Sequence, residues 1–217
     1  TGNVICGNTI IHQYGIGIQC YTPDSRIEKN EIRSSGKSEA CIATLANTNT
    51  IIADNELTLT DGSRQFHAAV ELIRSKDIEV KNNKFVETSG VLCTYGCNGS
   101  IMFTGNEIGL TGKQYGENTY YTAPFEFHDD KASFAISGNR FDVNETRASQ
   151  LIETPEGFRG SLTFDNNMVS MGQSDDDNSF FSYLVRNVDK LSVGSNQYRT
   201  KKNAIRKMSN KHNIGIQ

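Results

Sequence analysis

Apolar and polar residues alternate in short runs along most of the chain, and polar turns separate these runs. In "DIEVKNNKFVETSG", residues 77 to 90, Ile78 and Val80 alternate with polar residues, Asn83 interrupts the run, and the alternation resumes at Phe85. A period of two predicts β-strands that bury one face. The sequence lacks amphipathic helical patterning, which argues against helical bundles and βαβ units.

The same frame, an apolar residue three positions before an Asn and another two positions after it, occurs eight times. The anchoring residues are Asn8, Asn30, Asn55, Asn83, Asn106, Asn139, Asn167 and Asn196. Their spacing ranges from 22 residues (Asn8 to Asn30) to 33 residues (Asn106 to Asn139). The chain is therefore a repeat protein, with repeats too irregular for leucine-rich repeats and too short for propeller blades.

Asn is suited to a corner between two strands. A sharp turn needs a residue at positive φ, and after Gly the least strained choice is Asn, whose side-chain amide also bonds to the local backbone. One Asn at the same corner of every repeat would stack at the spacing of neighbouring strands and form an amide ladder. We therefore predict one stacked column with positive or bridging φ, which contains Asn30, Asn55, Asn83, Asn106 and Asn139.

A third apolar run precedes each corner, so each repeat, or coil, is predicted to contain three short strands. These runs lie at Ile16, Cys41, Val70, Val91, Phe125, Ile152 and Phe181. The distance from this run to the following Asn is 13 to 15 residues, whereas the distance from an Asn to the next run varies from 8 to 19 residues. Insertions that collect in one connection per coil are typical of solenoids whose loops project from one face.

Three strands per coil, an Asn corner between the second and third strands, and variable loops before the first strand resemble the pectate-lyase-like superfamily of single-stranded right-handed parallel β-helices. The resemblance covers about Gly2 to Tyr198. It implies an all-β solenoid of about eight coils over residues 1–198, and we assign residues 199–217, from their charge, to a basic capping segment. The superfamily includes polysaccharide lyases, glycoside hydrolases, epimerases, viral tailspikes and noncatalytic adhesins. The resemblance thus implies a secreted, cell-surface or virion protein with a glycan partner.

Length and composition agree with one solenoid domain. A chain of 217 residues with 36% hydrophobic residues can fill one narrow core. No apolar run approaches the roughly 20 residues that span a bilayer, so no membrane span is expected. Because "TGNVICGNTI" begins directly on a strand, we expect the sequence to be a segment of a longer protein.

The formal net charge of −3 conceals a basic C-terminal segment. Six Lys or Arg residues and no acid occur between Arg199 and His212, so the rest of the chain carries about −9 (−3 minus 6). A basic tail can bind nucleic acid or an anionic partner. We favour a charged final turn that keeps the open end of the solenoid from stacking on another copy, and we expect no nucleic-acid partner.

The five cysteines indicate buried free thiols rather than a disulfide framework. Cys20, Cys41 and Cys93 lie in or beside first strands, where small apolar residues stack in the interior, and free Cys is among the most buried residue types. The spacing of Cys93 and Cys97 leaves a local bridge or a metal pair as the alternative. No set of Cys or His has zinc-finger spacing, and neither a metal nor a cofactor is expected.

Candidate catalytic groups lie on the outward side of the first strands, where alternation places Glu71, Glu126 and Glu153. Neighbouring coils are separated by about 4.8 Å, so Glu126 and Glu153 should be nearest neighbours and Glu71 should lie roughly 10 Å from Glu126. Paired carboxyl groups are about 5 to 5.5 Å apart in retaining glycosidases and about 6.5 to 9.5 Å apart in inverting ones. A catalytic pair and a solvated polar face are the two interpretations of this row.

Candidate substrate-binding residues surround these carboxylates. They are His67, Asp129, Asp130, and three aromatic residues of the longest connection, Tyr115, Tyr120 and Tyr121. Tyr beside a carboxylate can hold a sugar ring, although Tyr in a long loop also serves as packing. His128 would assist proton transfer, and "HDD" at residues 128–130 is similar to the paired aspartates of polygalacturonases. We interpret "QSDDDNS", residues 173–179, as a hydrated acidic loop rather than a calcium site.

Two hypotheses from different classes follow. The first is an extracellular polysaccharide-binding β-helix that also degrades its glycan as a hydrolase or lyase, with Glu126 and either Glu71 or Glu153 as acid and base or nucleophile. The second is a noncatalytic structural or adhesive segment, such as the shaft of a viral tailspike or a bacterial surface protein, with a homotrimer in the tailspike case. The acidic row favours the first, and the missing lyase signatures favour the second.

The alternation also predicts which residues fill the interior. The predicted interior set is Ile78, Val80, Phe85, Ile101, Phe103, Ile108, Phe134, Ile136 and Phe141.

Overall fold

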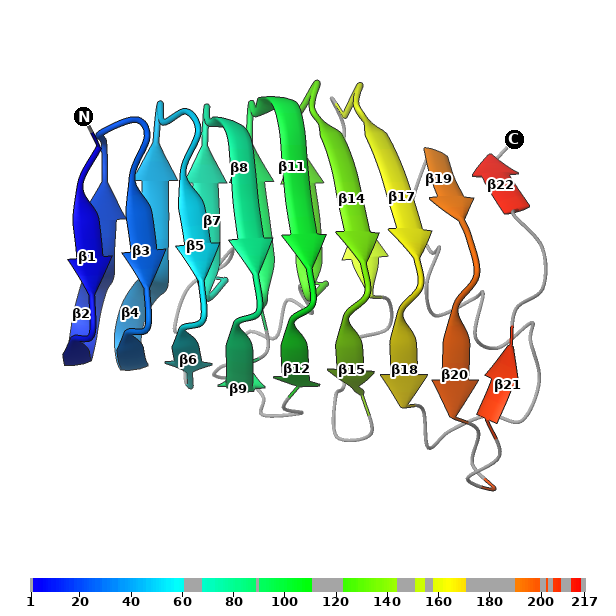
Figure 1. The fold of residues 1–217 in the computed structure, drawn as a ribbon, viewed down its shortest axis with the longest axis horizontal. Helices are drawn as coiled ribbons and strands as arrows, with labels where there is room; N and C mark the ends of the chain where they lie inside the picture. Colours follow the sequence, from blue (N-terminus) through cyan, green and yellow to red (C-terminus); the bar gives the residue numbers. More distant parts are fainter. Residues whose placement is uncertain are drawn as a thin grey trace.

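The computed structural model describes residues 2–60, 68–88, 90–110, 123–143, 151–154, 158–170, 190–199, 202, 205–207 and 212–215. Within these ranges the regular elements are all β-strands. The strands lie side by side in two layers, and the chain advances from one end of the stack to the other (Figure 1). The prediction of an all-β protein with long parallel sheets is therefore confirmed, and the arrangement is compatible with a β-solenoid. The described residues contain no helix that is long and apolar enough to cross a membrane.

The second strands of the coils form a nine-stranded sheet. In spatial order it contains β1 (Val4–Cys6), β3 (Arg26–Glu28), β5 (Ile51–Ala53), β8 (Lys76–Lys81), β11 (Asn98–Thr104), β14 (Ser133–Ser137), β17 (Ser161–Asp165), β19 (Lys190–Val193) and β22 (His212–Gly215). All neighbours up to β19 are parallel. Neighbouring strands in this sheet come from successive repeats. Because they are parallel, the chain must cross through the other sheet between them.

The first and third strands of the coils share a thirteen-stranded sheet. Its first-strand half contains β16 (Ile152–Glu153), β13 (Phe125–His128), β10 (Leu92–Tyr95) and β7 (Val70–Ile73). Its third-strand half contains β6 (Glu56–Leu59), β9 (Lys84–Thr88), β12 (Glu107–Leu110), β15 (Arg140–Asp142), β18 (Met168–Ser170), β20 (Gln197–Arg199) and β21 (Ile205–Lys207). Between the halves lies β4 (Glu31–Leu45), which also pairs with β2 (Thr9–Cys20).

The length of β4 explains why one sheet contains two rows of strands. Its beginning, Glu31 to Ser34, pairs with β6 in the third-strand half, and its end, Ile42 to Leu45, pairs with β7 in the first-strand half. The connection between a third strand and the next first strand is short in these first coils, so the two strands run together without a loop. The register between β2 and β4 shifts between His12 and Tyr14 and again between Gly15 and Ile16, which accommodates the change of strand direction. Third and first strands are separate from β6 onward, including β9 and β10, where the connection from Asn83 to Val91 is as short as that from Asn8 to Ile16.

The core lies between the two sheets and is filled by residues of equivalent positions in successive coils. Val80, Phe103, Ile136 and Phe164 are register partners on β8, β11, β14 and β17. All nine residues of the predicted interior set are at most 2% exposed, which confirms the predicted inward phase. Aromatic rings meet across the core, for example Phe103 against Phe125 with ring centroids 5.1 Å apart.

The Asn residues of the frame are joined by hydrogen bonds at the corner between the two sheets. The Oδ1 atom of Asn55 accepts hydrogen bonds from both the backbone N–H and the Nδ2 group of Asn30, at 2.9 and 3.0 Å. The Nδ2 group of Asn55 donates in turn to Asn83 Oδ1 and to the carbonyl oxygen of Ile27. The same bonds link every successive pair from Asn8 to Asn196.

The position of the left-handed residue differs from the expectation. Positive φ falls one residue before the Asn, for example at Lys29, Asp54 and Gly105, and not on the Asn itself. The reversal of the chain is thus completed before the Asn. Its side chain then points into the stack, where Asn106 is only 1% exposed and its Nδ2 group donates to Asn139 Oδ1 and to the carbonyl oxygen of Val80.

The C-terminal segment ends the parallel order of both sheets. The strand β21 is antiparallel to β20, with Tyr198 opposite Arg206, and β22 is antiparallel to β19. Both strands lie at the C-terminal end of the stack (Figure 1). In the sequence this segment carries the basic residues, of which Arg199 and Lys202 are exposed.

Candidate functional site

The first strands place five side chains in one row across successive coils. In register these are Ala43 on β4, Glu71 on β7, Cys93 on β10, Glu126 on β13 and Glu153 on β16. We call this set the outward row. The predictions that Glu126 and Glu153 are nearest neighbours and that Glu71 lies two coils from Glu126 are confirmed.

The outward row lies on the opposite side of its strands from the core. Phe125 and Phe127 on either side of Glu126 belong to the hydrophobic core, so the alternation turns Glu126 away from it. We expected solvent-facing carboxylates, but Glu71 is only 8% exposed and Glu126 only 5% exposed. Buried carboxyl groups are costly unless they are paired, protonated or bound to a cation. This row is therefore unlike an ordinary solvated face.

His128 is held beside Glu126 by two contacts. Its Nε2 atom lies 3.1 Å from Glu126 Oε2, and its ring stacks on Tyr95 with centroids 4.7 Å apart and an interplanar angle of 15°. Tyr95 is the register partner of His128 on β10 and shares a hydrogen bond with the Cys93 thiol. The strand pairing thus brings a thiol, a carboxylate, an imidazole and a phenol onto one face of two neighbouring strands.

Asp129 and Asp130 form the corner that follows β13. Asp129 has positive φ, and Asp130 is fully buried. The Asp130 carboxylate accepts hydrogen bonds from the Thr94 hydroxyl at 2.5 Å and from the Cys97 N–H at 2.6 Å. Burial raises the pKa of Asp130 to about 6, against the opposing effect of these hydrogen bonds. Asp130 joins two coils, as the Asn residues do at the other corner.

All five cysteines are free thiols, and only Cys6 is exposed. The prediction of buried thiols therefore holds for Cys20, Cys41, Cys93 and Cys97. The prediction that Cys93 stacks in the interior is wrong, because its register partners are Glu71 and Glu126 of the outward row. Burial raises the pKa of the Cys93 thiol, and the negative charges of Glu126, Glu71 and Asp130 raise it further.

Several predicted site residues lie outside the described residues. These are His67, Tyr115, Tyr120, Tyr121 and the acidic stretch at residues 173–179. The connection from Thr111 to Pro124 is described only at Ala123 and Pro124, which are buried. The described part of the predicted site therefore consists of the outward row with His128, Asp129 and Asp130.

The surroundings of Glu71 in the outward row disfavour the ionised form of its carboxyl group. Burial raises the pKa of its carboxyl group to about 7, and the negative charge of Glu39 contributes to the rise. Among the described residues, none donates a hydrogen bond to this carboxyl group. Glu71 is therefore half protonated near neutral pH and can act as a proton donor there.

The raised pKa of Glu71 predicts a pH dependence of stability. The folded protein holds the Glu71 proton more tightly than the unfolded chain, so this contribution is complete below the ordinary pKa of 4.5 and is lost as the pH rises to about 7. Between pH 4.5 and pH 8 the wild type should lose about 2 kcal/mol of unfolding free energy relative to Glu71→Gln. One pKa unit corresponds to about 1.4 kcal/mol, and local relaxation around the buried carboxylate reduces the loss below the value that the full pKa shift would give.

Urea denaturation of both proteins at a series of pH values measures this difference, since groups that titrate equally in both proteins cancel. Glu107→Gln, at an exposed position, is the matched control and should follow the wild type. Parallel curves for the wild type and Glu71→Gln would contradict the raised pKa.

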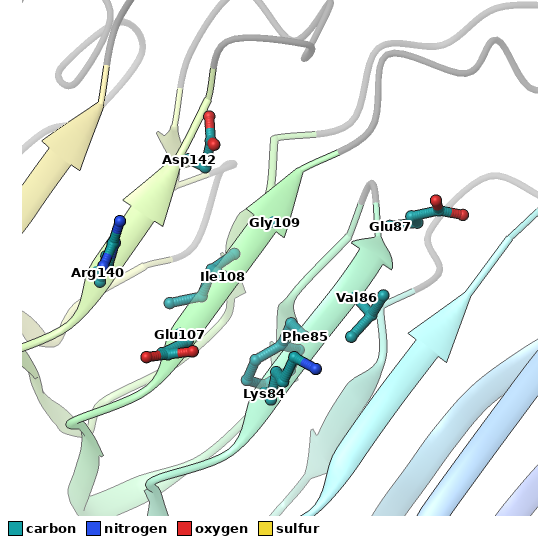
Figure 2. A pocket seen from close by; sticks show the side chains of 9 residues that line it. All are labelled: Lys84, Phe85, Val86, Glu87, Glu107, Ile108, Gly109, Arg140 and Asp142. Atoms are coloured by element: carbon teal, nitrogen blue, oxygen red, sulfur yellow. The ribbon is translucent and has the colours of Figure 1, made fainter.

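A second feature, a shallow groove, lies over the third-strand half of the large sheet (Figure 2). Its volume is ≈ 300 Å³. Lys84, Glu107 and Arg140 are register partners on β9, β12 and β15 and line one end of it. Gly109 forms part of the floor, with Glu87 and Asp142 at the other end (Figure 2).

A second groove of ≈ 360 Å³ shares Arg140 and Asp142 with the first and extends over β18 and β20 to Arg199. The two grooves therefore form one shallow surface across five coils. It carries Lys84, Arg140 and Arg199 together with Glu87, Glu107 and Asp142, so it favours neither an anionic nor a cationic ligand. This surface was not predicted from the sequence, although the charged residues that line it alternate with Phe85, Ile108 and Phe141.

Comparison of the chain with models of protein families, with curated proteins and with solved structures finds no match in any of the three.

Proposed function

We propose that the protein is an extracellular, polysaccharide-binding parallel β-helix that hydrolyses its glycan at the outward row. In this proposal the fold is the right-handed β-helix of the pectate-lyase-like superfamily, with about eight coils of three strands. Glu71 donates the proton to the leaving oxygen, and Glu126 accepts a proton from the attacking water.

The observation that carries this proposal is the spacing of two buried carboxyl groups on one face. Glu71 and Glu126 are separated by the register position of Cys93 alone, so their backbones lie two coils apart. Two strand spacings amount to about 9.6 Å. Inverting glycosidases hold their acid and base about 6.5 to 9.5 Å apart, with room for a water molecule between the sugar and the base.

The environments of the two groups support different roles. The pKa of Glu71 is raised to about 7 by burial, which leaves it a proton to donate near neutral pH. Glu126 Oε2 lies 3.1 Å from His128 Nε2, so an imidazole that can assist proton transfer stands beside the proposed base. Glu153, one coil from Glu126, offers the shorter spacing of a retaining pair. The product configuration distinguishes the two pairs.

A noncatalytic structural or adhesive role is the second candidate. It is favoured by the low exposure of Glu71 and Glu126, 8% and 5%, and by the unbroken Asn column through successive coils. In this case the protein would be the shaft of a viral tailspike or of a bacterial surface protein. Its buried polar row would serve stability alone.

Activity on a panel of acidic and neutral polysaccharides separates these candidates. Reducing-end assays should show cleavage, absorbance of unsaturated products should stay at background because hydrolysis forms no double bond, and NMR should show inversion at the anomeric carbon. Retention would assign the reaction to Glu126 and Glu153 instead. Unsaturated products would show that the protein cleaves its glycan by a lyase reaction and not by hydrolysis. Absence of cleavage across the panel by folded protein would leave the structural role.

A further inference from the structure

Three groups of different chemistry converge where β10 and β13 pair. The Cys93 Sγ atom, a Glu126 carboxylate oxygen and a His128 ring nitrogen all lie within 4.8 Å of one another. Cys93 and Glu126 are buried, and the His128 side chain is 14% exposed. Thiolate, carboxylate and imidazole are the three ligand types with which proteins hold zinc.

The strand geometry fixes this arrangement. Glu126 and His128 are two residues apart on β13 and therefore point to the same face, while Cys93 is the direct register partner of Glu126 on β10. Tyr95, the partner of His128, stacks on its ring and shares a hydrogen bond with the Cys93 thiol. Contacts of this kind orient metal ligands from behind and limit their rotation.

The local charge also favours a cation. The carboxylates of Glu71, Glu126 and Asp130 all act on Cys93 electrostatically. Among the described residues, His128 Nε2 lies 3.1 Å from Glu126 Oε2, and no Lys or Arg forms an ion pair with Glu71, Glu126 or Asp130. Glu71 lies one coil beyond Cys93, at most 8% exposed and without a hydrogen-bond donor from the described residues. A divalent ion would offset this concentration of buried negative charge.

We propose that Cys93, Glu126 and His128 bind one Zn²⁺ ion and leave its fourth position to water, on the side of Glu71. Zinc ligands at about 2.0 to 2.3 Å from the ion lie roughly 3.5 Å from one another. His128 Nε2 and Glu126 Oε2 are already 3.1 Å apart, so the approach that is needed, at most about 1 Å, falls to the Cys93 Sγ atom. Side-chain rotation alone can provide this movement. A closed site with four protein ligands would be structural, whereas three ligands and an open position are typical of catalytic zinc.

This inference extends the proposed hydrolysis. It rests on that proposed function only for the catalytic role of the ion, and not for its binding. With zinc bound, the ion would lower the pKa of its water, which would release one proton to bulk solvent before the attack, and Glu126 would hold the ion instead of accepting that proton. The leaving oxygen would take its proton from Glu71, one coil away from Cys93. The binding of the ion itself requires no substrate and can be measured without any activity.

The test uses Co²⁺ and Zn²⁺ with the full chain after chelation and desalting. Co²⁺ titration should give one ion per chain and a near-ultraviolet sulfur-to-cobalt charge-transfer band, and added Zn²⁺ should abolish this band. Cys93→Ala should eliminate the band and weaken Zn²⁺ binding at least tenfold in calorimetry. Ala fits this position because Ala43 occupies the same row. His128→Gln should weaken Zn²⁺ binding by a similar factor. Its sulfur-to-cobalt band should be weaker than that of the wild type but still detectable.

Cys6→Ser is the matched control, because Cys6 is the exposed thiol and the most accessible to adventitious metal. This variant should bind both ions like the wild type. Loss of the band in Cys6→Ser, or an unchanged band in a folded Cys93→Ala protein, would overturn the inference. Polysaccharide cleavage that persists with chelated, metal-free protein would refute a catalytic role of the zinc while leaving the hydrolase intact. Zinc binding without cleavage would retain the site and refute the hydrolase.

Discussion

Replacement of Phe103 by alanine is expected to lower the free energy of unfolding by about 3 to 5 kcal/mol, as for other buried aromatic truncations. Phe103 lies in the middle of the nine-stranded sheet on β11 and is 1% exposed. Its ring contacts Phe125 of the opposite sheet at 5.1 Å and Phe85 of the third-strand row at 5.6 Å. Its removal leaves a cavity between coils that the hydrogen-bonded strands cannot close.

Urea denaturation followed by circular dichroism measures this loss. Met102→Ala is the matched control, because Met102 is the neighbouring residue on the same strand but is 38% exposed. It should cost less than about 1 kcal/mol, as is usual for surface substitutions. Equal losses for both variants would show that the two faces of β11 contribute alike and that the core is not where the alternation places it.

The inward phase of the strands was predictable because burial imposes a period of two on each of them. Ile78, Phe103 and Phe141 were assigned to the interior from alternation alone, and all three are buried. The Asn frame was equally readable, since an amide that bonds to the next coil must recur once per coil. The left-handed residue was placed one position too late. The signal for its true position was present, because Gly105 and Gly138 precede their Asn directly.

The other corner could not be found from a repeated residue, because different residues perform the same function there. Its buried members are Ser25, Asn47, Ser75, Cys97 and Asp130. Each follows a residue with positive φ, and their side chains or backbones bond between coils, as Asn47 N–H does to Ser75 Oγ. A hydroxyl, an amide, a thiol and a carboxylate can all accept such a bond. The physical requirement is constant while the sequence varies.

The order of the side chains in the candidate site was predictable from the sequence, whereas their burial was not. Alternation gave the register of Glu71, Glu126 and Glu153, because one residue per strand must occupy each position of the row. Cys93 was missed as a member, because "GVLCTY" aligned with "PFEFHD" places Cys93 opposite Phe127, one position away from its observed partner Glu126. Exposure depends on what packs above a strand, and a pattern within the strand carries no information about it.

Replacement of Glu126 by glutamine is expected to lower turnover of the cleaved polysaccharide at least 100-fold, because general acid–base catalysis typically contributes 10²- to 10⁴-fold. Gln keeps the size of the side chain and can still accept a hydrogen bond from His128, whose Nε2 lies 3.1 Å from Glu126 Oε2 in the wild type. It can neither take a proton nor carry the charge that binds a cation. The loss should therefore appear in kcat rather than in KM, as for an interaction made in the transition state.

The measurement is the initial rate of reducing-end release at several pH values, with folding checked by urea denaturation. Glu107→Gln, at an exposed carboxylate on β12 in the third-strand half of the sheet, is the control and should keep turnover within about twofold of the wild type. Glu71→Gln separates the two roles, because loss of the acid should abolish the alkaline limb of the pH profile, whereas Glu126→Gln should retain that limb. Full activity in folded Glu126→Gln protein would exclude the outward row as the active site and leave the stacked coils as a structural shaft.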